Sequence, residues 1–178
     1  VGCGIGLLTT FYAQRCPGAT VVGIDRSPAS ITLARQRAEA LGLSNLRFEC
    51  LDLDQRELSG RYDLIVATHT LLQAEQDPGL PSSDWQDFSR ALEAGAQLDF
   101  EQRTGVGRRL DQLRNVLAEN GRMILFEKTR QLARRVPFQR ALAARGLMPL
   151  RSPEPIRYRS IEEVTDDGPL YVTGLVSS

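Results

Sequence analysis

The sequence predicts an α/β domain with a doubly wound, mostly parallel sheet and an antiparallel strand near its C-terminal end. Short apolar runs alternate with amphipathic segments along the chain, as expected for successive βαβ units. Near the end, the runs "LMPLRSPEPIRYRS" and "LYVTGLV" are joined by "IEEVTDDGP", which is too short to hold a crossover helix. These two strands are therefore predicted to be antiparallel neighbours. A length of 178 residues indicates a single domain over residues 1–178.

The first elements surround a glycine-rich turn. The opening stretch "VGCGIG" is typical of a strand end that turns directly into a helix, and this helix is predicted to end near Cys16. A strand follows over Thr20–Asp25, and then a helix with Ser27 as N-cap, Pro28 at its first position and Gly42 as its stop. The apolar stripe of this second helix is predicted to comprise Ile31, Ala34, Ala38 and Leu41.

The later elements continue the alternation. A strand is predicted over Leu46–Asp54 and another from Tyr62 through Ala67. Helices are predicted over Ser89–Phe100 and from Val106 to a stop at Gly121. The final elements are the strand "RMILFEK", the helix "VPFQRALAARG" and the two late strands.

The composition limits the kinds of partner that the protein is expected to bind. Lys+Arg and Asp+Glu both number 22, so a balanced net charge gives no long-range attraction for nucleic acid or an anionic membrane, and neither partner is expected. "TRQLARR" (129–135) is interpreted as a solvated helix face, with anion binding as the alternative. Three cysteines without a Cys-x-x-Cys pair, and one histidine, favour reduced thiols in a cytoplasmic protein and no metal site. No apolar run approaches the ~20 residues of a membrane span.

Residues at two predicted strand ends indicate a ligand-binding site. In open α/β sheets, ligands bind beyond the carboxyl ends of the strands. Glycines at Gly2, Gly4 and Gly6 allow a ligand to approach the backbone closely, and the helix N-terminus behind them favours negative groups. Asp25 ends the next strand and can accept hydrogen bonds from two adjacent ribose hydroxyls; the alternative is a helix N-cap.

Two further strand ends carry polar groups. Asp52 can accept a hydrogen bond from an adenine amine, with the Leu53 backbone available to a ring nitrogen. The alternative is that Asp52 is a turn acid, and Asp54 competes for either role. Thr68 and His69 end the following strand.

These segments, in this order, resemble the class I S-adenosylmethionine-dependent methyltransferases, whose sheet is Rossmann-like. "VGCGIG" is similar to their first motif, "VVGIDRSPASITLAR" to the second, "FECLDL" to the third and "YDLIVATHTLL" to the fourth, while "LDQLRNVLAENGRMILFEK" resembles the region of their fifth strand. The family has an acid two residues before the first glycine, at the end of a central first strand. Both positions fall before Val1, so the chain is interpreted as truncated within the first motif, with its first strand missing.

The resemblance implies S-adenosyl-L-methionine as cofactor. Asp25 would take the ribose hydroxyls, and Arg26 would flank the adenine. Asp52 and Leu53 would contact the adenine edge. The contacts implied around the methionine, ribose and methyl group involve Gly2, Cys3, Gly4, Gly6, Ala67 and Thr68.

The expected reaction is in-line methyl transfer to a small-molecule acceptor. His69 is the candidate general base, with a polar pocket wall as the alternative; Glu127 is a second candidate, with a structural hydrogen-bond role as the alternative. Because the fourth motif lacks an Asn-Pro-Pro-Tyr sequence, oxygen or carbon acceptors are favoured. Residues 73–100 are expected to cover the acceptor, with Trp85 and Phe88 either lining its pocket or packing in the core.

Two other classes of function are considered. One is a catalytically silent methyltransferase-like domain that binds a partner. The other is a nicotinamide-dependent dehydrogenase, whose fingerprint Gly-x-Gly-x-x-Gly requires a small residue where this chain has Leu7. The antiparallel tail also counts against a dehydrogenase.

Overall fold

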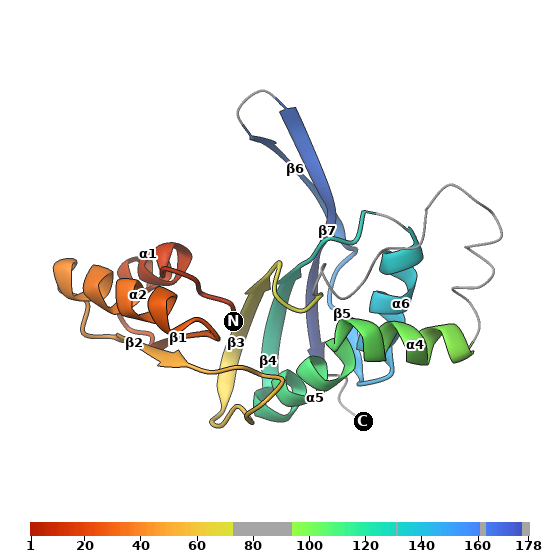
Figure 1. Cartoon of the computed structure of the whole chain (residues 1–178), viewed down its shortest axis with the longest axis horizontal. Coiled ribbons are helices and arrows are strands. Elements are labelled where there is room, and N and C mark those ends of the chain that lie inside the picture. Colours follow the sequence, from red (N-terminus) through yellow and green to blue (C-terminus); the bar gives the residue numbers. More distant parts are fainter. Residues whose placement is uncertain (73–93, 131, 161–162, 176–178) are drawn as a thin grey trace. The chain divides into compact units, whose positions relative to one another are not determined.

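The chain divides into two compact units, Val1–Glu57 and Leu58–Ser178, named the N-terminal unit and the C-terminal unit. Helices and strands alternate in the N-terminal unit, and the C-terminal unit also combines strands with helices, which confirms the predicted α/β class (Figure 1). No described helix is both long enough and apolar enough to cross a membrane. The computed structural model describes residues 1–72, 94–130, 132–160 and 163–175.

The N-terminal unit is a small parallel sheet with two helices. Its two strands pair in parallel, with Val21 opposite Leu46 and Asp25 opposite Cys50. Because the strands run in the same direction, Asp25 and the residues that follow Cys50 lie at the same edge of this sheet. The elements are α1 (Leu7–Arg15), β1 (Val21–Asp25), α2 (Pro28–Ala40) and β2 (Leu46–Cys50).

Helix α2 begins and ends as the sequence predicts. The Ser27 hydroxyl accepts a hydrogen bond from the Ser30 N–H at 3.2 Å, Pro28 is the first helical residue, and Gly42 follows the helix with φ 63°. The predicted place of Leu41 in the apolar stripe is wrong: the helix ends at Ala40, and Leu41 is 45% exposed. The core of this unit comprises Ile31, Ala34, Ala38 and Phe48, with Cys3 and Leu46 partly buried against it.

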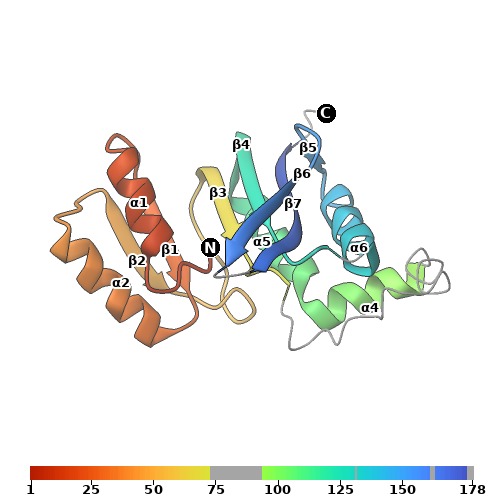
Figure 2. The same cartoon turned by 90° about the horizontal axis from the view of Figure 1, so that it is seen from above.

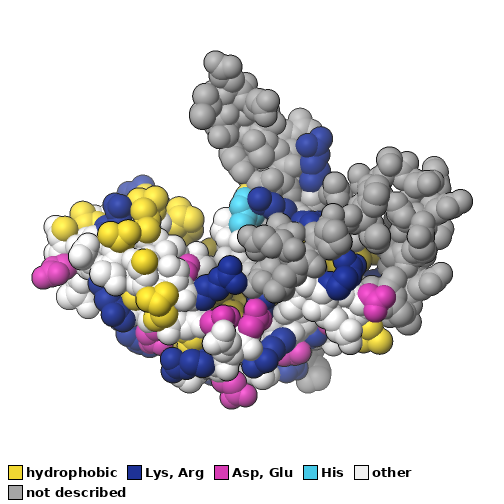
Figure 3. All heavy atoms as spheres, in the orientation of Figure 1, with side chains coloured by type: hydrophobic (Ala, Val, Ile, Leu, Met, Phe, Trp, Pro, Cys, Tyr) yellow, Lys and Arg dark blue, Asp and Glu magenta, His cyan; other side chains and the backbone are white. Residues whose placement is uncertain are grey.

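Helix α1 buries its small side chains and exposes its large apolar ones. Thr9, Thr10 and Ala13 are buried, and the Thr10 hydroxyl donates to the Gly6 carbonyl at 2.9 Å. Hydrophobic side chains gather over α1 in the space-filling view (Figure 3). The exposed large side chains of this helix are Leu7, Leu8, Phe11 and Tyr12.

The C-terminal unit contains a five-stranded mixed sheet. The order is β3-β4-β7-β5, with β6 also paired to β7. β3 and β4 are parallel, whereas β7 is antiparallel to β4, β5 and β6, which confirms the predicted antiparallel late strands (Figure 2). The strands are β3 (Tyr62–Thr68), β4 (Leu117–Phe126), β5 (Leu147–Pro149), β6 (Glu154–Ser160) and β7 (Glu163–Leu175); the helices are α4 (Ala94–Thr104), α5 (Val106–Val116) and α6 (Leu132–Ala143).

Several predicted boundaries in this unit are wrong, among them the start of β7, which begins at Glu163 rather than Leu170. The helix that begins at Val106 ends at Val116 rather than near Gly121, because β4 starts at once and pairs with β3. The pairing changes register between Leu117 and Arg122, so the intervening residues bulge from the ladder. Helix α6 starts four residues before the predicted helix, and the first late strand is divided into β5 and β6.

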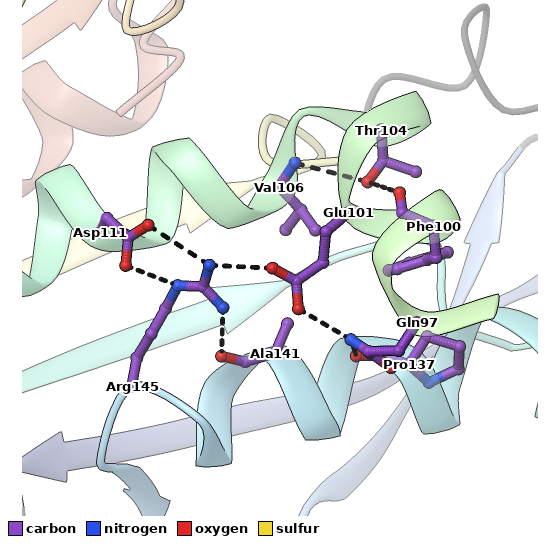
Figure 4. Close-up of polar contacts among 9 residues, drawn as sticks. All are labelled: Gln97, Phe100, Glu101, Thr104, Val106, Asp111, Pro137, Ala141 and Arg145. Carbon is purple, nitrogen blue, oxygen red and sulfur yellow. Dashed lines mark hydrogen bonds and ion pairs between the residues drawn. The ribbon is translucent and has the colours of Figure 1, made fainter. Parts of the chain in front are cut away.

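Arg145 joins the three helices of this unit that the structure describes (Figure 4). The Arg145 guanidinium contacts Glu101 of α4 at 2.9 Å and Asp111 of α5 at 2.8 Å, and it donates to the Ala141 carbonyl of α6 at 2.9 Å. Burial alone would lower the pKa of Arg145, but the two carboxylates more than offset it, and the pKa is raised. The guanidinium therefore stays charged and fixes the C-terminal end of α6 against α4 and α5.

Candidate functional site

The glycine turn before α1 is closed by backbone hydrogen bonds. The Cys3 N–H donates to the Ile24 carbonyl of β1, and the Gly6 N–H donates to the Cys3 carbonyl, both at 2.9 Å. The φ angles are 65° at Gly2, 51° at Gly4 and 80° at Gly6. The turn is therefore joined to β1 and leads into α1 through left-handed backbone.

The glycines at Gly4 and Gly6 face different surroundings. A Cβ on Gly6 would lie 2.8 Å from Phe48 Cζ and 3.0 Å from Ala34 Cβ, so core packing accounts for glycine there. A Cβ on Gly4 would have no described atom within 4 Å. The open space beside Gly4 is compatible with the predicted close approach of a ligand, whereas core packing is sufficient to explain Gly6.

Asp25 is turned toward the glycine turn. Its Oδ2 accepts a hydrogen bond from the Gly4 N–H at 2.8 Å, and its Oδ1 accepts one from the Ser27 N–H at 2.9 Å. Asp25 is only partly buried at the end of β1, and Arg26 beside it is exposed. Because an ionised carboxylate has about four acceptor positions, these two backbone bonds leave acceptor capacity for a ligand.

Cys3, between the glycines, is held as a neutral thiol. Burial and the negative charge of Asp25 raise its pKa to about 11. At pH 8 a thiol with this pKa is about 0.1% thiolate, compared with roughly a quarter for an unperturbed thiol of pKa about 8.5. The structure therefore offers no support for Cys3 as a nucleophile.

Iodoacetamide is expected to label Cys3 about 100-fold more slowly than an unperturbed thiol at pH 8, with a rate that keeps rising up to about pH 11. Peptide mass spectrometry across a pH series measures this, and exposed Cys16 is the internal control. Asp25→Asn should accelerate the labelling of Cys3 because it removes a neighbouring negative charge. Equal labelling rates at Cys3 and Cys16 would contradict a raised pKa for the Cys3 thiol.

Asp52 lies in a turn after β2, which ends at Cys50 rather than at the predicted Asp54. Its Oδ1 accepts a hydrogen bond from the Asp54 N–H at 2.9 Å, and its carbonyl accepts one from the Arg56 N–H at 2.9 Å. Leu53 is buried, with 6% of its surface exposed. These contacts are those of a turn acid, and they leave Asp52 only partly buried.

In the C-terminal unit, Ala67, Thr68 and His69 lie at the end of β3. The Ala67 side chain is fully buried, Thr68 is half-buried and His69 is exposed. The His69 N–H donates to the Phe126 carbonyl at 2.8 Å, and the centres of their two rings lie 5.0 Å apart. His69 adopts a φ of 50°.

Glu127, the second predicted candidate, follows β4 and is fully buried. Its Oε1 accepts hydrogen bonds from the Thr70 and Leu71 N–H groups at 2.9 Å, and its Oε2 accepts one from the Leu72 N–H at 3.3 Å. Burial raises the pKa of Glu127. The three hydrogen bonds and the positive charge of Arg109 act to lower this pKa, but they do not offset the effect of burial. These contacts are those of a structural hydrogen-bond partner.

Arg109 was not among the residues predicted from the sequence. It is 3% exposed, and its Nη1 donates to the Leu71 carbonyl at 2.6 Å and the Thr104 carbonyl at 2.9 Å. A signal was available: Arg109 follows Val106 by three residues and precedes Leu113 by four, so it lies on the apolar face of α5. A charged residue on such a face needs buried partners.

The predicted acceptor side is only partly described. Trp85 and Phe88 lie outside the described residues, as does the start of the predicted helix over Ser89–Phe100. The described part of that helix is α4, in which Phe100 is 3% exposed and belongs to the core.

Curated relatives match the chain over part of its length. Malonyl-[acyl-carrier protein] O-methyltransferase from Acetivibrio thermocellus is 41% identical over 70 residues, which are 39% of this chain and 24% of the relative. Trans-aconitate 2-methyltransferase from Deinococcus radiodurans is 41% identical over 86 residues, which are 48% of this chain and 31% of the relative. The matches thus span 24% and 31% of these relatives' length.

A solved structure and a family assignment extend the comparison to most of the chain. Magnesium protoporphyrin IX methyltransferase from Synechocystis PCC 6803, solved with bound SAM, shares the fold with a TM-score of 0.60 at 20% identity; the match covers 97% of this chain and 67% of that one. The family described as "Methyltransferase domain" matches residues 1–143, which excludes the dehydrogenase alternative. The chain therefore belongs to the class I S-adenosylmethionine-dependent methyltransferases.

Proposed function

We propose that the protein transfers a methyl group from S-adenosylmethionine to a small-molecule acceptor, at oxygen or carbon. The observation that carries this proposal is the Asp25 carboxylate, held by the Gly4 and Ser27 N–H groups and still partly exposed at the end of β1. It lies against a glycine whose missing side chain leaves open space. A carboxylate that accepts from hydroxyls, next to backbone that a ligand can approach, fits a nucleoside with an attached amino acid.

The N-terminal unit supplies most of the proposed cofactor contacts. Asp25 accepts hydrogen bonds from the ribose hydroxyls through its two unused acceptor positions. The turn residues Gly2, Cys3, Gly4 and Gly6 provide the backbone surface for the methionine and ribose. Arg26, Asp52 and Leu53 are assigned to the adenine: Asp52 accepts from the exocyclic amine, and buried Leu53 takes part through its backbone.

The C-terminal unit supplies the groups assigned to the methyl-transfer step. Ala67 and Thr68 border the methionine end, where Ala67 acts through its backbone because its side chain is fully buried. His69 takes the proton from an acceptor hydroxyl or acidic carbon as the new bond to the methyl carbon forms. S-adenosylmethionine, when bound, supplies a methyl group on a positively charged sulfur, which keeps the electron pair of the broken C–S bond.

The name of one relative supports oxygen as the acceptor atom, and the name of the other supports a small molecule as the acceptor. One matched relative is named as an O-methyltransferase, and the substrates named for the two are malonyl-[acyl-carrier protein] and trans-aconitate. We assign the two compact units to one methyltransferase domain over residues 1–178. The family match over residues 1–143 supports this because it crosses the boundary between the units.

The test is calorimetry on the complete protein with S-adenosylhomocysteine, the demethylated product, for which a dissociation constant in the micromolar range is expected. A fluorescence titration with a reduced nicotinamide cofactor is the control and should detect no binding. Transfer of labelled methyl from S-adenosylmethionine is then measured with trans-aconitate and malonyl-[acyl-carrier protein] as probes. Absence of binding at millimolar S-adenosylhomocysteine would refute the proposed function.

His69→Gln separates catalysis from binding in the same assays. If His69 is the base, kcat with an acceptor that must lose a proton is expected to fall about 100-fold or more. The dissociation constant of S-adenosylhomocysteine should stay within about three-fold of the wild-type value because the binding residues are intact. An unchanged kcat would remove His69 from the chemical step.

A further inference from the structure

The backbone after β3 is in a conformation that needs support. His69 has φ 50°, and within the described ranges it is the one residue other than glycine with a positive φ. A side chain is disfavoured in this left-handed region, so the surrounding structure must hold it there. The hydrogen bond from the His69 N–H to the Phe126 carbonyl, at 2.8 Å, ties this residue to the end of β4.

The next three N–H groups all point to one carboxylate. Those of Thr70 and Leu71 donate to Glu127 Oε1, and that of Leu72 donates to Glu127 Oε2. Successive N–H groups that converge after a left-handed residue form an anion-binding concavity of the kind called a nest. The anion in this concavity is the Glu127 side chain, which is fully buried.

Arg109 holds the same segment from α5. Its Nη1 donates to the Leu71 carbonyl at 2.6 Å, so both backbone polar groups of Leu71 are bound by buried charged side chains. The same nitrogen also donates at 2.9 Å to the carbonyl of Thr104, the last residue of α4. The positive charge of Arg109 compensates the negative charge of Glu127 in the protein interior.

We propose that Glu127 and Arg109 are positioning residues that fix the backbone of residues 69–72 and thereby the direction of the His69 imidazole in the methyl-transfer step. This inference rests on the proposed function, because the role of His69 is taken from it. Glu127 and Arg109 act through the backbone and exchange no proton with the acceptor. Their expected effect on the reaction is geometric, since a displacement of about 1 Å can cost about 100-fold in rate.

The first test uses the protein without cofactor and compares Glu127→Gln with wild type. A glutamine places an N–H donor opposite one of the backbone N–H groups and removes the charge. Hydrogen exchange at residues 70–72 should accelerate roughly 10-fold or more. The NMR signals of the His69 ring, identified by their loss in His69→Gln, should move because the contact with Phe126 changes.

Glu119→Gln is the matched control, because Glu119 is an exposed acid in β4, the strand that Glu127 follows. It should leave the exchange at residues 70–72 and the His69 ring signals at their wild-type values. Arg109→Lys is the second variant, which keeps the positive charge but lacks the guanidinium. If Glu127→Gln does not fold, Arg109→Lys tests in its place whether the buried charged side chains hold residues 69–72. The proposal would be overturned if every folded variant kept the wild-type hydrogen exchange and His69 ring signals. It would also be overturned if hydrogen exchange changed equally throughout β4 and β7.

The second test is kinetic. Glu127→Gln should lower kcat about 10- to 100-fold and leave the dissociation constant of S-adenosylhomocysteine within about three-fold. In the His69→Gln background the same change should cost little more, because the two residues act through one group. Full additivity of the two losses would overturn the proposal. If wild type neither binds S-adenosylhomocysteine nor transfers methyl, the proposed function fails, while the exchange and NMR results still decide whether Glu127 holds the segment.

Discussion

Replacing Asp25 with alanine is expected to weaken the binding of S-adenosylhomocysteine by about 100-fold. Hydrogen bonds to a charged group contribute about 1.5–3 kcal/mol each, and 1.4 kcal/mol is tenfold in affinity. The change removes the acceptors proposed for the ribose and also the partners of the Gly4 and Ser27 N–H groups, so the turn loses its support from β1. Calorimetry on the complete protein measures the affinity, and circular dichroism checks that the variant is folded.

Two further variants test whether the loss of affinity comes from the Asp25 contact itself and not from the removal of a negative charge near the site. Asp25→Asn keeps one oxygen acceptor without the charge and should fall between wild type and Asp25→Ala. Glu49→Gln is the matched control, because Glu49 lies in β2 next to the strand end, in an exposed ion pair with Arg47, and such pairs contribute little. An affinity for Asp25→Ala within two-fold of wild type would contradict the assigned role of Asp25.

Replacing Gly6 with alanine should lower the free energy of unfolding by about 2–4 kcal/mol, of which the left-handed backbone accounts for about 1–2 kcal/mol and overpacking for the remainder. The added Cβ would lie 2.8 Å from the Phe48 ring and 3.0 Å from the Ala34 side chain, in the core of the N-terminal unit. Ala34 Cβ can move only together with α2, and the Phe48 ring can turn away only by repacking the core around it. Urea denaturation monitored by circular dichroism measures the loss.

Gly4→Ala is the matched control, with a similar φ of 51° but no described neighbour within 4 Å of the added Cβ. It should cost only the backbone term of about 1–2 kcal/mol, and it should weaken the binding of S-adenosylhomocysteine if Gly4 lies against the cofactor. Phe48→Leu, which removes the ring, should recover part of the stability lost in Gly6→Ala. Equal losses for Gly4→Ala and Gly6→Ala would show that backbone conformation alone explains both glycines.

Features set by neighbouring residues in the chain were predictable from the sequence. The limits of α2 follow from Ser27, Pro28 and Gly42, because an N-cap, a first-turn proline and a terminal glycine act within a few residues of their own positions. Asp25 at the end of an apolar strand followed from the same local pattern. The antiparallel direction of β7 followed from the length of the connection before it.

Features that depend on distant residues were not predictable. The hydrogen bonds that Glu127 accepts join it to residues that lie 55 to 57 positions away in the sequence, and no local pattern encodes them. Phe48 fills the space beside both Gly6 and Gly23, so a glycine motif interpreted as a ligand surface is in part a packing motif. The early start of β4 depends on its pairing with β3, which overrides the terminal signal at Gly121.

The backbone at position 69 restricts the side chains that evolution or a designer can place there. Asparagine, aspartate and glycine tolerate its dihedral angles, whereas valine, isoleucine and threonine are branched at Cβ and clash with the main chain. In a saturation library at this codon, the β-branched members are therefore expected to be destabilised by about 1–3 kcal/mol. Among the members without a branch at Cβ, differences in activity would report on the chemistry of the side chain.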